Sequence, residues 1–186
     1  MDERSENVSK KYTAVSICLQ QFVDKGLFAT TSRDLSKALN LQTAGMYSYF
    51  ENKDEAVIAC AEEAAKKLES DLMNIAVDRI SEPYVMMAEL KKKAKEMAPM
   101  MRFFTQVCST EKYEERIRPM LSGLSIRYEN CAKDLATHLN VDVESIKHFV
   151  YMTITAIVNY MVYQEDSYVD PQLRFVAEQI SKISDK

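Results

Sequence analysis

Apolar residues recur every three or four positions along most of the chain, which is the period of an α-helix. Residues that punctuate turns are scarce, with 3 Gly and 4 Pro in 186 residues. The pattern therefore predicts an all-α protein of about nine helices and disfavours a sheet. The predicted helices cover residues 6–25, 31–39, 42–50, 52–80, 83–97, 99–108, 111–139, 143–165 and 171–183, and Pro119 and Gly123 are points where the seventh can bend or split.

The stretch Thr30–Asp54 is predicted to hold two short helices joined by a tight turn. Thr31 or Ser32 can supply the oxygen that caps the first helix, and Asp34 is placed to reach back toward the free amide groups. Asn40 stands where a residue that tolerates left-handed backbone ends a helix. Helices this short must pack on a larger body to be stable. A helix-turn-helix of this kind places the start of its second helix in the DNA major groove.

The order of residues around this stretch is specific. An apolar helix is followed by Lys-Gly-Leu-Phe-Ala-Thr-Thr, then by a helix, a turn and the pattern Gly-Met-Tyr-x-x-Phe-x-x-Lys. From about Val15 to Val57 this order resembles the TetR (tetracycline-repressor-like) family of bacterial transcriptional regulators. Asn40 replaces the family's usual Gly and Ser36 its usual Ala, and both replacements are small and compatible with a turn. The resemblance rests on Phe22, Gly26, Thr31, Arg33, Asp34, Leu35, Ala38, Gly45, Tyr47, Phe50 and Lys53.

The start of the second short helix carries side chains that can read DNA. Glutamine can make paired hydrogen bonds to adenine, Thr and Ala methyl groups can meet thymine methyl groups, and hydroxyl groups can bond to base edges or phosphate. The resemblance implies that Tyr47 contacts phosphate, that Lys53 clamps the DNA backbone and that Arg33 touches base or phosphate. Alternatively, Tyr47 and Tyr49 only pack the small domain. The predicted DNA-binding residues are Arg33, Gln42, Thr43, Ala44, Tyr47, Ser48, Tyr49 and Lys53.

Three other residues of the same helix have simpler explanations. Gly45 has no side chain and so permits a close approach of backbone and DNA. Met46 and Phe50 are expected in the core of the small domain, because they recur at helical spacing among polar neighbours.

The charge balance is unusual for a DNA-binding protein. The chain has a formal net charge of −4, and residues 1–55 hold seven Lys/Arg and eight Asp/Glu, a net charge of −1. A strongly basic footprint is therefore missing. Only the face presented to phosphate needs to be positive, however, and five cations can share it. These are Lys10, Lys11, Arg33, Lys37 and Lys53.

The predicted DNA-binding domain spans residues 1–52, and residues 53–186 are expected to form a helical effector-binding and dimerisation domain. A long helix, Lys53–Ile80, connects them. The segment Phe149–Tyr163 is apolar almost all round, yet it is shorter than the roughly 20 residues that span a bilayer, so no membrane anchor is expected. Such a helix has to cover both its own core and a partner. Together with Pro171–Ile183 it resembles the family's two dimerisation helices. The predicted interface residues are Phe149, Met152, Ile157, Tyr160, Met161 and Phe175.

The second half of the chain is rich in Met and Tyr, whose side chains suit a pocket that adapts to apolar or aromatic ligands. Most of these residues are individually as well explained by ordinary core packing. The family resemblance, and not the composition, implies a small-molecule effector. The predicted effector-binding residues are Met86, Met101, Phe104, Met120, Tyr128 and Tyr151.

No pattern of catalytic residues, structural metal ligands or cofactor binding is recognisable, so an enzyme is not expected. The four cysteines lie far apart and no signal peptide is evident, which favours free, mostly buried thiols in a reducing cytoplasm. A redox-sensing cysteine is the less favoured alternative. The basic cluster Lys91–Lys95 is interpreted as a solvated face, and a second contact with nucleic acid or an anionic ligand is its alternative.

These observations together predict a homodimeric repressor that binds a palindromic operator in double-stranded DNA and is released by a small-molecule ligand. In the mechanism that the resemblance implies, the ligand displaces the connecting helix and changes the spacing of the two reading helices. The alternative function is a helical protein-interaction or ligand-carrier protein of the same fold that has lost DNA binding. Its only support is the near-neutral charge of the N-terminal residues.

Overall fold

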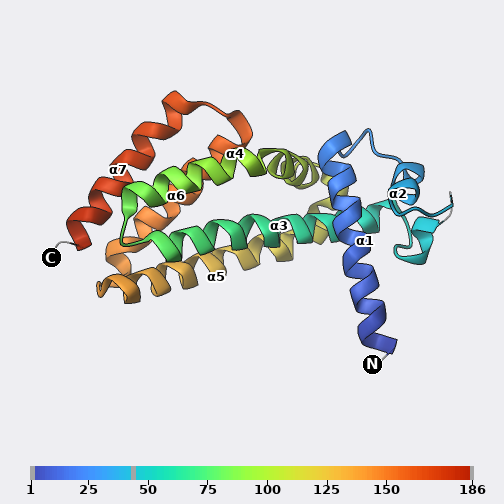
Figure 1. Ribbon diagram of the computed structural model, residues 1–186, viewed down its shortest axis with the longest axis horizontal. Helices are drawn as coiled ribbons and strands as arrows, with labels where there is room; N and C mark the ends of the chain where they lie inside the picture. Colours follow the sequence, from blue (N-terminus) through green and yellow to red (C-terminus); the bar gives the residue numbers. More distant parts are fainter. Residues whose placement is uncertain (1–2, 43–44, 185–186) are drawn as a thin grey trace. The chain divides into compact units, whose positions relative to one another are not determined.

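The computed structural model describes residues 3–42 and 45–184, and every regular element in these ranges is helical (Figure 1). The all-α prediction is confirmed. Within these ranges no helix is both long enough and apolar enough to cross a membrane. The α-helices are α1 (Glu3–Lys25), α2 (Ser32–Ala38), α3 (Lys53–Arg79), α4 (Pro83–Cys108), α5 (Glu114–Leu139), α6 (Val143–Tyr163) and α7 (Asp166–Ser184), and the 3₁₀ helices are η1 (Gly45–Ser48) and η2 (Glu111–Tyr113).

The prediction of nine helices was too high, because the described ranges contain seven α-helices. The break expected at Pro99 does not occur, and α4 continues through it to Cys108. Proline removes one backbone hydrogen bond from a helix. Met97 and Met101, on either side of Pro99, are both buried, so apolar packing on both sides of the proline stabilises the continuous helix.

Two further prolines and a glycine also lie inside helices. Pro119 and Gly123 both lie inside α5, which is not split. The last helix begins at Asp166 and so includes Pro171, which was predicted to be its first residue. Proline and glycine thus did not end these helices, although each lowers helix propensity locally.

Packing divides the chain into two compact units. The first unit consists of Met1–Lys67 and Arg102–Arg118, and the second consists of Leu68–Met101 and Pro119–Lys186. The predicted DNA-binding domain, residues 1–52, lies inside the first unit. This unit is discontinuous in sequence, because it also includes the end of α4, η2 and the beginning of α5.

Two buried aromatic rings stack in the first unit. The rings of Phe22 in α1 and Phe103 in α4 stack with their centroids 5.1 Å apart, and both side chains are buried. Cys18 and Cys60 are buried in the same unit as free thiols. Burial raises the pKa of the Cys18 thiol to about 11, which disfavours the reactive thiolate. The prediction of free, mostly buried cysteines is confirmed, since Cys131 is also buried and Cys108 is partly exposed.

In the second unit, α6 packs along α7. Lys91 of α4 forms ion pairs with Asp166, at 2.8 Å, and with Asp170, both in α7. Lys93 forms an ion pair with Asp71 at 2.9 Å. The cluster Lys91–Lys95 is therefore only partly a solvated face, because two of its lysines tie α4 to neighbouring helices.

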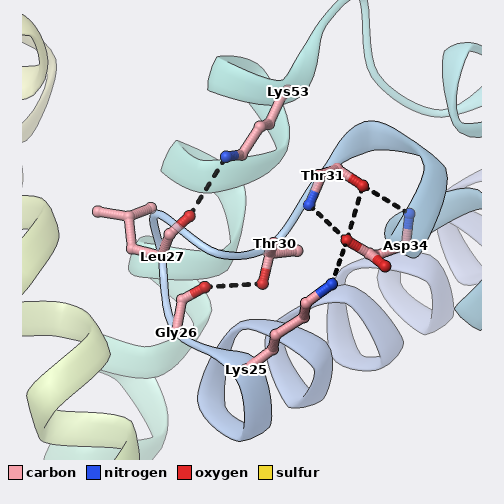
Figure 2. Close-up of polar contacts among 7 residues, drawn as sticks. All are labelled: Lys25, Gly26, Leu27, Thr30, Thr31, Asp34 and Lys53. Carbon is pink, nitrogen blue, oxygen red and sulfur yellow. Dashed lines mark hydrogen bonds and ion pairs between the residues drawn. The ribbon is translucent and has the colours of Figure 1, made fainter.

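Local signals explain where α1 ends and α2 begins (Figure 2). Gly26 follows α1 with a φ of +92°, a left-handed conformation that glycine adopts without strain, and its N–H donates to the carbonyl of Phe22 at 2.8 Å. Thr31 is the N-cap of α2. The Asp34 N–H donates to the Thr31 hydroxyl oxygen at 3.2 Å, and the Thr31 N–H donates to the Asp34 carboxylate at 2.7 Å. The predicted capping box is confirmed.

A cation completes this box. The Lys25 ammonium donates to the Asp34 carboxylate at 2.7 Å, and the Thr31 hydroxyl donates to the same carboxylate at 2.6 Å. The Lys25 hydrogen bond, together with those from Thr31, holds the pKa of the Asp34 carboxyl well below its usual range. The ionised carboxylate therefore fastens the end of α1 to the start of α2.

This arrangement predicts a pH-dependent stability. The folded pKa of Asp34 lies below the unfolded value of about 3.9, so its stabilising effect is present above that value and is lost as the pH falls through the folded pKa. In thermal unfolding, Asp34→Asn should lower Tm most at pH 5 to 7, and the difference from wild type should shrink below about pH 4. Thr31→Ala should cost about 1 kcal/mol through the lost cap.

Asp24→Asn is the matched control for this prediction. The Asp24 carboxylate accepts a hydrogen bond from Gln20 on the exposed side of α1, a bond that an amide oxygen can also accept. Its Tm should stay close to that of wild type at every pH. An Asp34→Asn effect that is equally large at pH 2 and pH 7 would contradict the role of the carboxylate charge.

Candidate DNA interface

The helix-turn-helix segment is anchored through the buried face of α2. Leu35 and Ser36 are both buried, and α2 packs against α1 and η1. The N–H of Met46 donates to the Ser36 hydroxyl oxygen at 3.2 Å. Ser36, which replaces the family's usual alanine, therefore joins α2 to η1.

The turn after α2 has the predicted left-handed residue. Asn40 has a φ of 56°, and its N–H donates to the carbonyl of Lys37 at 3.0 Å. Gly45 is required for a reason that the sequence did not suggest. A Cβ atom at this position would lie 2.2 Å from the Cβ of Leu41, so any side chain would displace the turn. The close approach at Gly45 is thus one within the protein.

The second helix of the predicted helix-turn-helix, residues 42–50, differs from the prediction. Among the described residues it is the 3₁₀ helix η1, which covers only Gly45–Ser48. Thr43 and Ala44, two of the predicted contact residues, lie outside the described residues. Glycine, tyrosine and serine are poor helix formers, and a stretch this short cannot offset the cost of starting an α-helix.

The predicted contact residues around η1 divide by exposure. Gln42, Ser48 and Tyr47 are exposed, and the Tyr47 side chain is 56% exposed. Tyr49 is half-buried, with its ring centroid 6.5 Å from that of Phe50. Met46 and Phe50 are buried, which confirms that they belong to the core. The exposed members are available to a ligand such as DNA, whereas Tyr49 is partly engaged in packing.

Lys53, the first residue of α3, is held by the loop that precedes α2 (Figure 2). Its ammonium donates to the carbonyl oxygen of Leu27 at 3.2 Å. The side chain is half-buried, and burial lowers the pKa of the Lys53 ammonium. An ammonium has three donors, so this bond orients Lys53 and leaves further donors for an external phosphate.

Two acidic side chains near α2 and η1 are engaged by cations of the protein. Besides the pair of Asp34 with Lys25, the Asp54 carboxylate lies 2.7 Å from the Lys112 ammonium. On α2, Arg33 and Lys37 are exposed and form no ion pair within residues 3–42 and 45–184. The unpaired charge on the exposed side of α2 is therefore positive, although the N-terminal region as a whole is slightly acidic.

Two further contacts with this region come from the end of α4 and from η2, which were not predicted to take part in DNA binding. The side-chain oxygen of Gln106, near the end of α4, accepts a hydrogen bond from the N–H of Leu27 at 3.4 Å. The hydroxyl of Tyr113, in η2, donates to the Asp54 carboxylate at 2.7 Å. No local pattern announces such contacts, because the partners lie 79 and 59 residues apart in sequence.

The predicted effector-binding residues are distributed over three helices. The three on α4, which are Met86, Met101 and Phe104, are buried. Those on α5 and α6 are half-buried, namely Met120, Tyr128 and Tyr151. Burial raises the pKa of the Tyr128 hydroxyl. Burial of this kind fits a closed pocket as well as ordinary core packing.

The predicted dimerisation residues divide into two groups. Ile157, Tyr160 and Met161 are buried within the single chain and have almost no surface to offer a partner. Their apolar character is explained by the packing of the chain itself, so they are not suited to the predicted interface. Met152 and Phe175 are 39% and 47% exposed, and Phe149 is half-buried.

Two exposed tyrosines on the same helices escaped the prediction. Tyr163 at the end of α6 is 74% exposed, and Tyr168 in α7 is 54% exposed. Tyr168 precedes Phe175 by two helical turns, so the helical period could have placed both on one face. The second unit thus has several large exposed apolar groups on α6 and α7.

Comparison with known proteins agrees with this architecture. Residues 18–60 match the family described as "Bacterial regulatory proteins, tetR family". A comparison with curated protein sequences found no match. The fold is similar to that of a TetR family transcription regulator from Marinobacter aquaeolei VT8, with a TM-score of 0.57 and 15% sequence identity over 95% of this chain and 97% of that chain. The family match covers α2, η1 and the start of α3, which present the exposed groups described above. Residues 18–60 are thus similar to the tetR family of bacterial regulatory proteins, and the fold as a whole is similar to that of a TetR family transcription regulator.

Proposed function

We propose that the protein is a homodimeric repressor that binds a palindromic operator and is released from it by a small-molecule ligand. The observation that carries the proposal is the set of exposed groups on α2 and beside η1. Arg33 and Lys37 are exposed cations with no ion pair among the described residues, and Tyr47 is an exposed aromatic donor. A regulator of chromosomal DNA works in the cytoplasm, which is the location that we propose.

The proposed contacts have different tasks. Arg33, Tyr47, Ser48 and Lys53 would bind phosphate and fix the register on the duplex, while Gln42 would read a base. Thr43 and Ala44 are proposed as further base contacts from the resemblance alone. Tyr49 is the weakest candidate, because its ring is partly packed beside Phe50.

Phosphate and base contacts predict different changes in DNA binding. Arg33→Ala should weaken binding to all sequences alike and reduce the slope of log K against log salt by about 1, because one phosphate contact is lost. Gln42→Ala should cost about 1–3 kcal/mol on the preferred site and relax the preference at one position. Fluorescence anisotropy on a duplex selected from a random library by the wild-type protein measures both effects.

Lys92→Ala is the matched control, since this lysine is exposed on α4 in the second unit. It removes one positive charge without touching the proposed interface, and its affinity should equal that of wild type. If all three variants bind alike, the residue roles are wrong. A ligand carrier that has lost DNA binding would show no salt-dependent binding to any duplex.

Dimerisation is proposed through the exposed apolar groups of α6 and α7. Met152, Tyr163, Tyr168 and Phe175 are large side chains that water disfavours on a monomer surface. A two-fold dimer presents two identical helix-turn-helix segments to DNA. Half-sites about one helical turn apart, 34–36 Å, require such symmetry.

A charge placed in this surface should separate the subunits. Phe175→Asp is expected to give a monomer in light scattering and to weaken binding to the full palindrome, while binding to an isolated half-site is kept. Phe28→Asp is the control for the light-scattering measurement and should remain dimeric, because Phe28 is 74% exposed but belongs to the first unit. A Phe175→Asp variant that remains dimeric would place the interface elsewhere.

An effector is proposed to bind among the Met and aromatic side chains of the second domain. To release DNA, the effector must favour one of two spacings between the helix-turn-helix segments of the dimer, with a coupling free energy of about 1–3 kcal/mol. In a thermal-shift screen of lipophilic, cationic and aromatic compounds, a ligand at about 100 times its Kd should stabilise the fold by roughly 2.7 kcal/mol. The same compound should lower the affinity for DNA, and stabilisation without any change in that affinity would contradict release by ligand.

A further inference from the structure

Two residues of η2 contact the first turn of α3. Asp54 follows Lys53 directly, and its carboxylate accepts a hydrogen bond from the Tyr113 hydroxyl at 2.7 Å. The Lys112 ammonium lies 2.7 Å from the same carboxylate and 5.1 Å from the centroid of the Tyr113 ring. Tyr113 is buried, with 5% of its surface exposed, so its hydroxyl is held in place by packing. Asp54 is therefore fixed by two neighbours 58 and 59 residues further along the chain.

The charge of Asp54 matters because of its position. A carboxylate next to a lysine that binds phosphate repels the same phosphate and cancels part of the lysine's attraction. Lys112 supplies the compensating positive charge, and its ammonium holds the pKa of the Asp54 carboxyl below its ordinary value. Asp54 thus stays ionised, and Lys112 neutralises it where it stands.

Lys53 itself is oriented from the same part of the chain. Its ammonium donates to the carbonyl of Leu27, and the N–H of Leu27 donates to the Gln106 side chain at 3.4 Å. Leu27 is buried, with 2% of its surface exposed. The end of α4 and η2 therefore reach both residues at the start of α3, one through Leu27 and one through Tyr113.

We propose that Lys112 and Tyr113, which lie outside the helix-turn-helix, are positioning residues for DNA binding. Lys112 neutralises Asp54 beside Lys53, and Tyr113 fixes that carboxylate, so Asp54 does not cancel the attraction between Lys53 and phosphate. The inference rests on the proposed contact between Lys53 and the DNA backbone.

A double-mutant cycle tests the charge argument. Lys112→Gln should weaken binding of the full-length protein to its selected duplex by about 3- to 10-fold at low salt, because Asp54 is then unmasked. Adding Asp54→Asn to the same chain should restore the affinity to within about twofold of wild type, since the repelling charge is gone. Lys93→Gln is the matched control, because Lys93 pairs with Asp71 at 2.9 Å in the second unit, and it should bind as wild type does.

Two outcomes would contradict the neutralisation of Asp54 by Lys112. Lys112→Gln with wild-type affinity shows that masking has no effect. A loss that persists undiminished in the double variant shows that Lys112 touches DNA directly or serves only the fold.

Hydrogen exchange without DNA tests Tyr113 separately. Tyr113→Phe keeps the buried ring and removes only the hydroxyl, so the amides of Glu55 and Ala56 should exchange faster while those in the second unit do not change. Unchanged exchange at these two amides overturns the positioning role of Tyr113. If the wild-type protein selects no duplex at all, the proposed DNA contact fails, and the exchange result still decides the positioning role.

Discussion

The positions of α2 and η1 depend on the apolar core on which they pack. The α2 helix and η1 are too short to be stable alone, so their geometry is set by the surfaces on which they pack. Met46 and Phe50 are buried on either side of the exposed Tyr47, and in the same unit Phe22 stacks on Phe103. A residue can be presented to DNA in a fixed direction only because its sequence neighbours are held by close packing.

Charge is organised locally rather than by overall composition. The formal sum over the N-terminal residues is slightly negative, but Asp34 is engaged by Lys25 and Asp54 by Lys112. The cations that remain unpaired among the described residues of α2 are Arg33 and Lys37. Because exposed charges are screened within about 8–10 Å at physiological salt, a nearby phosphate responds to these local groups more than to the net charge.

Signals that act within one helical turn were predicted correctly from the sequence. The cap at Thr31, the reach of Asp34 and the left-handed Asn40 all follow from residue type and spacing. The TetR-like order of motifs likewise agrees with the family match over residues 18–60. These features were predictable because the responsible partners are close neighbours in the chain.

Features that depend on packing were missed or misplaced. Pro99 did not end its helix, because the residues on both sides are buried. Tyr160 was assigned to a partner, although the chain buries it by itself. Gln106 contacts Leu27, and Tyr113 contacts Asp54. These partners are far apart in sequence, so the helical periodicity does not predict that they meet.

The discontinuity of the first unit has a consequence for biosynthesis. Its N-terminal part ends at Lys67, but the residues that complete its packing extend to Arg118. At translation rates of about 5–20 residues per second, roughly 3 to 10 s separate the synthesis of these two points. Until Phe103 has been made, the nascent polypeptide carries Phe22 without the aromatic ring that stacks on it, and chaperones can bind the uncovered surface.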